Sequence, residues 1–289
     1  MMNNKPVIMV TGWLGQLGSE LFDIAGNYPQ FEFNFSDKDE MDLMNAEQIT
    51  SFFEQLKPAY FISCGAYTAV DKAETDREIA LAINADAPGT IAALCSQYNT
   101  KLIHISTDYV FSGNSTEPYK EDDVTDPVNF YGYSKLLGEK LVLQNNDNTI
   151  VIRTSWVYST YGNNFVKTML RLMGSRPEIS VVSDQVGSPT YARDLAAAIM
   201  AIVTNPSGEF TTGVYHFSND GIISWYDFAV AIKEIKHLNC IVHPIPTTAY
   251  PTPAKRPAYS GMSKEKITST FPIKLKGWRE VLEECLAKL

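Results

Sequence analysis

Short apolar runs alternate with helix-compatible segments along the first half of the chain. Polar or small residues flank each run, as expected of buried strands bounded by turns. The runs predict strands at residues 7–10, 31–35, from 60, at 101–106 and at 149–153, with helices at 45–56, from 71, at 91–98 and from 131. Alternating strands and helices of this length form a parallel sheet with right-handed crossovers. The pattern therefore predicts an α/β fold with a Rossmann-like doubly wound parallel sheet.

The pattern is less regular beyond residue 153. It predicts a helix ending at 173, strands at 179–183, 214–217 and 241–245, and helices at 193–203, from 225 and at 281–289. Ser224 is the predicted cap of the helix from 225, because Asp227 stands at the third helical position and completes a capping-box pattern. We expect a smaller C-terminal lobe from this part of the chain.

Three glycines, Gly12, Gly15 and Gly18, directly follow the first predicted strand. A Gly with partners at +3 and +6 is expected only about 0.06 times in a chain of this composition. In dinucleotide-binding proteins such glycines permit a tight turn, the approach of a pyrophosphate and close packing of the next helix. The start of that helix also offers free N–H groups to phosphates. The alternative is a glycine-rich turn without a ligand.

Asp37 follows the second predicted strand, 19 residues after Gly18, where a carboxylate that binds the adenosine ribose is expected. Lys38 stands next to it and could instead pair with a 2′-phosphate. The sequence therefore leaves NADH and NADPH open. The third predicted strand runs into small residues around Gly65, which suits close approach to a flat cofactor.

A candidate catalytic segment extends from Ser106 to Lys135. Thr107 lies at the predicted end of a buried strand, and ligands of open α/β sheets bind at that edge. Tyr131 and Lys135 are four residues apart in a helix-compatible segment, so both side chains share one helical face. A lysine cation is expected to lower the pKa of a nearby tyrosine from about 10. Tyr131 could then give a proton to a carbonyl oxygen, with Thr107 donating a second hydrogen bond.

The Tyr/Lys spacing by itself is weak evidence. Tyr-x-x-x-Lys is expected about once by chance in a chain with this Tyr and Lys content, and it occurs once. The simpler interpretation is a tyrosine and a lysine on the exposed face of a surface helix. Only the accompanying motifs favour a catalytic pair.

The composition and charge of the chain mainly exclude some classes of partner and location. The 289 residues are 45% hydrophobic and 20% charged, as in an ordinary globular protein, and the net charge is −9 with a pI near 5.0. That charge argues against nucleic-acid and acidic-membrane partners. No stretch approaches the roughly 20 apolar residues of a membrane span, and the run at 7–10 is too short for a signal peptide. The four cysteines, without a Cys-x-x-Cys pair, predict free thiols and a cytoplasmic protein.

With these motifs in place, the chain resembles the extended short-chain dehydrogenase/reductase superfamily and, within it, the branch of dTDP-4-dehydrorhamnose reductases. The resemblance covers nearly the whole length. Gly12-x-x-Gly15-Gln-Leu-Gly18 and Tyr131-x-x-x-Lys135 mark the superfamily. The branch is indicated by Ala66-Tyr-Thr-Ala-Val-Asp-Lys-Ala-Glu74, Ser106-Thr-Asp-Tyr-Val-Phe111, Arg153-Thr-Ser-Trp156, Asp184-Gln-x-Gly-x-Pro-Thr190 and Arg256-Pro-x-x-Ser260.

The resemblance implies a role for each matching residue. Tyr131 corresponds to the proton donor, Lys135 to the supporting cation that also holds the nicotinamide ribose, and Thr107 to the carbonyl-binding hydroxyl. The implied cofactor-binding residues are Gly12, Gly15, Gln16, Leu17, Gly18, Asp37, Asp42, Leu43, Gly65, Ala66, Tyr67 and Lys135. The implied substrate-binding residues are Thr107, Asp108, Tyr131 and Trp156, and we add Arg256 because a guanidinium fork suits diphosphate oxygens. A structural ion pair is the alternative for Arg256.

The implied reaction is hydride transfer from NADPH or NADH to C4 of dTDP-4-dehydro-β-L-rhamnose, which gives dTDP-β-L-rhamnose for surface polysaccharide. Residues 1–152 would form the dinucleotide-binding Rossmann domain, and residues 153–289 mainly a substrate-binding lobe with some segments returning to the sheet. Some relatives use Mg²⁺ held by glutamates at a subunit interface. Glu20 matches one such position, but no ligand cluster predicts a metal site. A homodimer is compatible with the resemblance.

Two other functions remain open from the sequence. A nucleotide-sugar 4-epimerase would use the same Tyr/Lys pair, whereas a non-catalytic relative, such as the regulatory subunit of methionine adenosyltransferase, would keep only the fold. Related dehydratases carry an Asp-Glu pair after the threonine, but here Asp108 is followed by Tyr109. Without that glutamate, ketone reduction fits better than elimination of water. The presence of Thr107, Tyr131 and Lys135 together argues against a non-catalytic module.

Overall fold

The structure, a computed structural model, describes residues 5–289, so the first four residues of the predicted 1–152 unit lie outside the described part. Its largest sheet has six parallel strands in the order β10-β5-β4-β3-β1-β2. They are β1 (Val7–Thr11), β2 (Glu32–Ser36), β3 (Tyr60–Ser63), β4 (Lys101–Thr107), β5 (Thr149–Thr154) and β10 (Gly213–His216). The strand order reverses between β1 and β3, the kind of point at which such sheets bind ligands. The predicted doubly wound α/β fold is confirmed.

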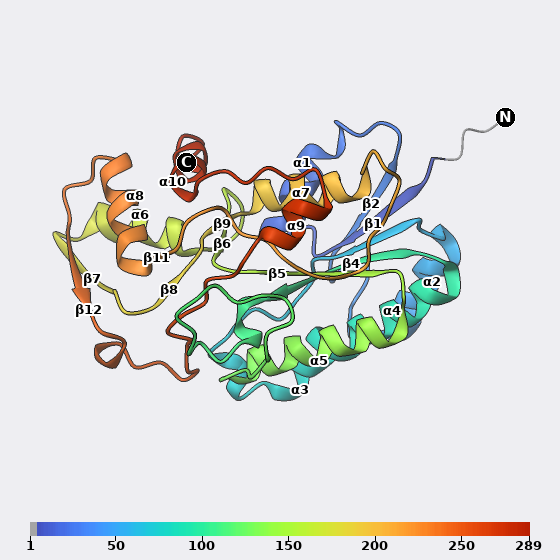
Figure 1. Ribbon diagram of the computed structural model, residues 1–289, viewed down its shortest axis with the longest axis horizontal. Helices are drawn as coiled ribbons and strands as arrows, with labels where there is room; N and C mark the ends of the chain where they lie inside the picture. Colours follow the sequence, from blue (N-terminus) through green and yellow to red (C-terminus); the bar gives the residue numbers. More distant parts are fainter. Residues whose placement is uncertain (1–4) are drawn as a thin grey trace.

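Helices cover both faces of this sheet (Figure 1). One face carries α1 (Gln16–Ala25) and α7 (Ala192–Val203), and the other carries α2 (Ala46–Leu56), α4 (Ala87–Tyr98) and α5 (Phe130–Asn145). Successive residues of β1 point to opposite faces: Ile8 and Val10 pack with α1 and α7, whereas Met9 packs with α2 and α4. The sheet is therefore buried on both sides, which explains why its strands are continuous apolar runs.

The chain beyond residue 153 contributes both to this sheet and to a smaller lobe. In the sheet, β10 pairs with β5 and α7 packs against α1. The smaller lobe lies toward the left of Figure 1 and has an apolar core of its own. It contains α6 (Phe165–Ser175), α8 (Trp225–Ile235), α10 (Trp278–Leu286) and the parallel pair β7 (Glu178–Val182) and β12 (Ile241–Ile245). Val166, Phe228 and Val281 join the three helices in this core.

The helix cap predicted at α8 is confirmed, whereas the helix predicted from residue 71 differs in the structure. Ser224 forms the predicted capping box, because its side chain accepts from Asp227 N while the Asp227 carboxylate accepts from Ser224 N. In place of the single helix expected from Asp71, the 3-10 turn η1 (Lys72–Glu74), α3 (Arg77–Leu81) and the π-helical turn η2 (Ala82–Asp86) precede α4. The Asp71 side chain caps no helix, since its carboxylate is bonded to the Arg256 guanidinium.

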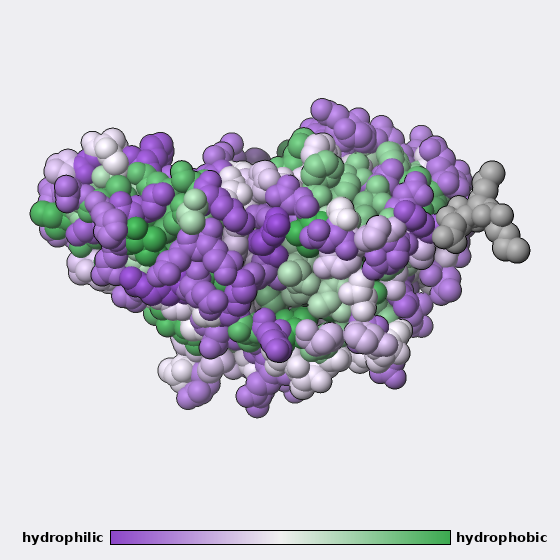
Figure 2. Space-filling view, turned by 90° about the horizontal axis from the view of Figure 1, so that it is seen from above, coloured by the Kyte–Doolittle hydropathy of each residue, from purple (hydrophilic) through white to green (hydrophobic). Residues whose placement is uncertain are grey.

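One helical run, Arg77–Tyr98, is long and apolar enough to cross a membrane by length and composition. In the folded chain, 56% of its most apolar window is buried. The core between the sheet and α2 includes three residues of this run, Ile91, Ala92 and Cys95. The run is therefore a core helix. Its length and apolar composition alone do not distinguish it from a membrane-spanning helix. The face drawn in Figure 2 shows hydrophilic side chains interspersed with smaller apolar patches.

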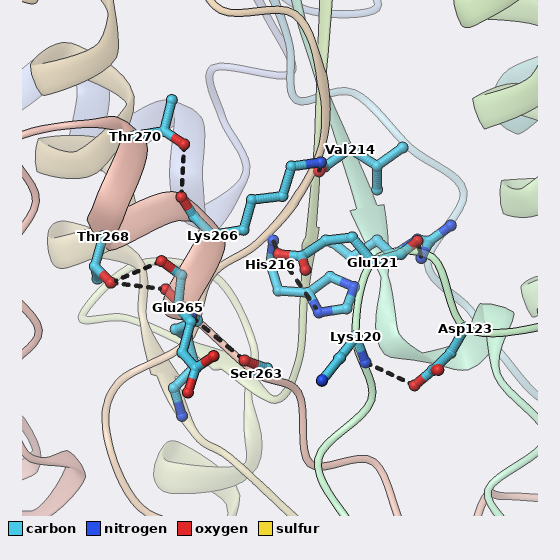
Figure 3. A network of polar contacts seen from close by, with 12 residues as sticks. Lys120, Glu121, Asp123, Val214, His216, Ser263, Glu265, Lys266, Thr268 and Thr270 are labelled. Atoms are coloured by element: carbon cyan, nitrogen blue, oxygen red, sulfur yellow. Dashed lines mark hydrogen bonds and ion pairs between the residues drawn. The ribbon is translucent and has the colours of Figure 1, made fainter.

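A buried histidine lies at the end of β10 beside a carboxylate (Figure 3). The His216 ring is fully buried, and its Nδ1 lies 4.0 Å from Glu121 Oε1. Burial, with the positive charge of Arg153 as the second cause, lowers the pKa of His216 to about 3. The ring is therefore neutral at neutral pH.

We expect His216 to make the fold sensitive to acid. The unfolded chain binds a proton there with an ordinary pKa of 6.5, whereas the folded chain does so only near 3. Stability should therefore fall as the pH drops from about 6.5 toward 3, by on the order of a few kcal/mol in total. In thermal melts between pH 7 and 4, His216→Gln should reduce this decline. His243→Gln, a change at a half-exposed histidine, is the matched control and should not. An equal decline in wild type and both variants would contradict the prediction.

Candidate active site

A cleft of about 970 Å³ opens at the carboxyl ends of β1, β3, β4 and β5. This is the edge at which the sequence places its ligands. Most predicted site residues line it: Gly12, Gly15, Gln16, Leu17, Asp37, Asp42, Leu43, Gly65, Ala66, Thr107, Asp108, Tyr131, Lys135 and Trp156. Gly18, Tyr67 and Arg256 are not among the lining residues. The fold thus brings the glycine turn, the end of β4 and the start of α5 to one place.

The turn after β1 has the geometry that its glycines predict. Gly12 has a φ of 68°, a left-handed backbone that favours glycine, and a Cβ there would lie 2.7 Å from Gly65 Cα. A Cβ on Gly18 would overlap Gly12 O and Trp13 Cα, so α1 can approach this closely only with glycine. Gly15 is the N-cap of α1 and lines the cleft, which places the free N–H groups of the first turn there. These features fit a dinucleotide pyrophosphate.

The polar groups beside the turn are partly bonded within the protein. Gln16 Nε2 donates to Val157 O at 3.2 Å, which ties the turn to the start of the smaller lobe. The Asp37 carboxylate accepts from Leu14 N at 3.1 Å and from Lys38 N at 2.8 Å. The side chain of Lys38 is exposed at the cleft, where it can meet a phosphate.

Lys135 is buried beneath the cleft. α5 begins after Asn129, whose side chain accepts from Gly132 N at 2.8 Å, so Tyr131 and Lys135 lie on its first turns and share one face. Lys135 is 2% exposed, and its ammonium donates to Ile105 O at 2.6 Å. Burial lowers the pKa of Lys135 to about 8, which leaves the group mostly charged at neutral pH.

The Tyr131 phenol does not have the lowered pKa that the Tyr/Lys spacing predicts. Burial raises its pKa to about 12, and hydrogen bonding with Thr107 offsets only part of this effect. The Lys135 ammonium is directed at the backbone of β4, while the phenol packs edge-on against Tyr109 with ring centroids 5.7 Å apart. Tyr131 is therefore protonated at neutral pH, which is the state that a proton donor needs.

Thr107 and Asp108 follow one another at the end of β4. Thr107 Oγ1 donates to Asp108 Oδ1 at 2.9 Å and accepts from Tyr109 N at 3.2 Å. Asp108 is 3% exposed, and burial raises its pKa to about 7. Its second oxygen, Oδ2, has no hydrogen-bond partner among residues 5–289. A carboxyl group with an unused oxygen suits a ligand hydroxyl.

Two stacked tryptophans form the wall on the side of the smaller lobe. The rings of Trp156 and Trp225 lie with centroids 3.5 Å and planes 10° apart, and both line the cleft. Trp156 has a φ of 48°, an uncommon and costly conformation for a bulky residue. Trp225 is a site residue that the sequence does not single out. Its one local signal, the position after the Ser224 cap, indicates a helix start and nothing about the cleft.

Two predicted residues are bonded away from the cleft. The Tyr67 hydroxyl donates to Asp76 Oδ2 at 2.8 Å. Arg256 donates to both oxygens of Asp71, at 3.0 and 2.9 Å, as in the ion pair given as its alternative role. The roles of Tyr67 and Arg256 in ligand binding therefore stay predictions.

Nothing supports Mg²⁺ at Glu20. Its buried carboxylate accepts from Ser159 Oγ at 2.6 Å and from Arg193 Nη1 at 3.2 Å. Within the described range, no group of three or more His, Cys, Asp or Glu side chains could hold a metal ion. In this structure Glu20 instead forms an ion pair with Arg193 that joins α1 and α7.

A glycine turn after the first strand of a doubly wound sheet, with Thr, Tyr and Lys in the same cleft, defines the class. The protein is of the extended short-chain dehydrogenase/reductase type.

Comparisons with known proteins then give the family. Residues 6–289 match the family model described as RmlD substrate binding domain. The chain is 40% identical over 299 residues to the dTDP-4-dehydrorhamnose reductase of Burkholderia thailandensis, covering 98% of each. It is 40% identical over 282 residues to the spore coat polysaccharide biosynthesis protein SpsK of Bacillus subtilis, covering 96% of each. A crystal structure of the Bacillus anthracis dTDP-4-dehydrorhamnose reductase in complex with NADP matches with a TM-score of 0.94 and 38% identity, over 99% of this chain and 100% of that one. The chain belongs to the dTDP-4-dehydrorhamnose reductase family, which confirms the predicted resemblance.

We predict that Gly18→Ala disrupts the glycine turn. The added Cβ would overlap backbone atoms of the turn, and overpacking of this kind costs about 1–3 kcal/mol. The melting temperature should fall by several degrees, and NADPH binding followed by fluorescence should weaken roughly tenfold or more. Gly174→Ala, within α6, is the matched control, since a Cβ there meets nothing within 4 Å. Wild-type NADPH affinity in Gly18→Ala would contradict the role assigned to the turn.

Proposed function

We propose that this chain reduces the C4 keto group of dTDP-4-dehydro-β-L-rhamnose to a hydroxyl, giving dTDP-β-L-rhamnose, with NADPH or NADH as the hydride source. One observation carries the proposal: Thr107, Tyr131 and Lys135 line the same cleft as the glycine turn. Full-length similarity to dTDP-4-dehydrorhamnose reductases supports the choice of substrate. Similarity to SpsK supports a place in polysaccharide biosynthesis.

The chemistry of the three side chains gives their roles. The Tyr131 phenol, which is protonated at neutral pH, gives its proton to the C4 oxygen as the ketone becomes an alcohol. Thr107 donates a second hydrogen bond to that oxygen when its single hydroxyl proton turns away from Asp108 Oδ1, to which it donates in this structure. The mostly charged Lys135 ammonium stabilises the phenolate left on Tyr131 and holds the nicotinamide ribose.

The two parts of the chain bind different ligands. Residues 1–152 hold mainly the dinucleotide, through the glycine turn, Asp37 and the loop at Gly65. Residues 153–289 hold mainly the nucleotide sugar, with Trp156 and Trp225 lining the cleft from this part of the chain. Arg256 is held by Asp71 through its two terminal nitrogens, so as a substrate residue it would bind a diphosphate through its remaining N–H groups or by rearranging this ion pair.

A spectrophotometric assay with dTDP-4-dehydrorhamnose tests the proposal directly. Each turnover should oxidise one NADPH or NADH, and the product should be dTDP-rhamnose by NMR. A 4-epimerase recycles its bound nicotinamide and consumes none, and a non-catalytic module turns nothing over. Either of these results would remove the proposed reaction.

We predict that Tyr131→Phe lowers kcat by about 10²–10⁴-fold, because the variant keeps the ring and loses the proton. NADPH affinity should stay within about twofold of wild type. Tyr133→Phe is the matched control, since Tyr133 is 49% exposed two residues further along α5. Turnover at the wild-type rate in Tyr131→Phe would exclude the phenol as the proton donor.

We predict that Lys38 favours NADPH over NADH. Its exposed ammonium at the cleft should pair with the 2′-phosphate, so Lys38→Ala should raise KM for NADPH roughly tenfold and leave KM for NADH unchanged. Lys140→Ala, at an exposed lysine of α5 outside the cleft lining, controls for the loss of one positive charge. Equal changes in the KM values for NADPH and NADH would show that Lys38 does not bind the 2′-phosphate.

The setting of the reaction is also part of the proposal. All four cysteines are free thiols, as predicted from the sequence, and this supports the reducing environment of the cytoplasm. A homodimer stays a prediction, which light scattering on the purified protein can test. We expect neither a nucleic-acid nor an acidic-membrane partner, because the net charge of the chain is −9.

A further inference from the structure

Three side chains from neighbouring elements meet beneath the cleft. Ser63 ends β3, His104 lies in β4 and Lys135 lies on α5. The parallel register pairs Ser63 with His104, so both side chains leave the sheet on the same face. His104 is fully buried, its Nδ1 lies 3.3 Å from Ser63 Oγ, and its Nε2 lies 3.5 Å from Lys135 Nζ. The proposed reaction assigns no role to His104 or Ser63.

The direction of these hydrogen bonds follows from the chemistry of the groups. An ammonium can only donate, so the His104 nitrogen that faces it, Nε2, must accept. The ring proton then sits on Nδ1, which donates to Ser63 Oγ. Burial and the nearby Lys135 charge hold the pKa of His104 well below its ordinary value, so the ring is neutral. The Lys135 ammonium therefore selects this tautomer, and the Ser63 hydroxyl, which can accept as well as donate, holds the Nδ1 side of the ring.

This arrangement aims the ammonium without neutralising it. Two of its three N–H groups point to Ile105 O and His104 Nε2, which leaves one for the cleft. A carboxylate in place of the imidazole would pair with the charge instead. The nearby Glu139 does not do so, because both of its oxygens accept from Arg153 at 2.8 to 3.2 Å.

We propose that His104 is a positioning residue for Lys135: its neutral ring, oriented by Ser63, directs the ammonium toward Tyr131 and the cofactor ribose. This inference deepens the proposed function and rests on it. It adds Ser63 and His104 to the groups on which the reaction depends, although neither touches the substrate.

Two polar substitutions at residue 104 separate positioning from packing. The shorter Asn amide can reach only Ser63, whereas the longer Gln amide can place its oxygen near the position of Nε2. His104→Asn should lower kcat roughly tenfold or more with KM for the sugar nucleotide within about twofold, and His104→Gln should retain most of the wild-type kcat. Ser63→Ala should give a smaller loss of kcat in the same sense.

The pH profile distinguishes positioning from a structural role. A hydrogen bond to the charged form raises the pKa of an ammonium, so its loss should lower the pKa of Lys135. The alkaline limb of kcat should then move to lower pH by about half a unit or more in His104→Asn and not in His104→Gln. Equal kcat losses in both variants, with lower melting temperatures and an unmoved limb, would show a packing role and overturn the proposal.

A second readout does not depend on turnover. With lysines labelled with ¹³C at Cε, NMR follows the titration of Lys135, whose signal is assigned by its absence in Lys135→Met. The titration midpoint should fall in His104→Asn and Ser63→Ala. If the wild-type enzyme does not reduce dTDP-4-dehydrorhamnose, the proposed function fails while this titration still tests His104. Unchanged midpoints in both variants would overturn the positioning role.

Discussion

A buried positive charge sets the main constraint on this structure. The Lys135 ammonium lies beneath the cleft, and a charge in such a place is tolerated only when hydrogen bonds replace the lost water. Ile105 O, on β4, supplies the shortest of these bonds at 2.6 Å. On the far side of α5, Asn84 Nδ2 donates to Ser134 Oγ at 3.0 Å. α5 is therefore held from the sheet and from η2, and with it Tyr131 is held at the cleft.

Burial acts in opposite directions on the acid and the cation of the site. It raises the pKa of Tyr131 to about 12 and lowers that of Lys135 to about 8, because in each case the charged form loses hydration. Near neutral pH the phenol keeps its proton while the ammonium keeps most of its charge. A single desolvated environment thus prepares both groups, and the lysine acts on the phenolate that the reaction forms rather than on the resting phenol.

Much of the fold was predictable because its signals are local. The strands of the six-stranded sheet lie within a residue or two of their apolar runs, and the glycine turn was expected from its position after β1. The helix expected from Asp71 was wrong for a non-local reason. The Asp71 carboxylate binds Arg256, 185 positions further along the chain. The residues around 71 do not indicate that partner.

By itself, the sequence determined the order of strands and helices, the glycine turn, and the grouping of Thr107, Tyr131 and Lys135 at one edge of the sheet. Periodicity and spacing suffice for these features, since they set which face of an element a side chain occupies. Only the tertiary structure decided that Trp225 stacks on Trp156, that His104 lies between Ser63 and Lys135, and that Tyr131 has a raised pKa. Burial and the choice of hydrogen-bond partner depend on segments that are distant in the chain and meet only when it folds.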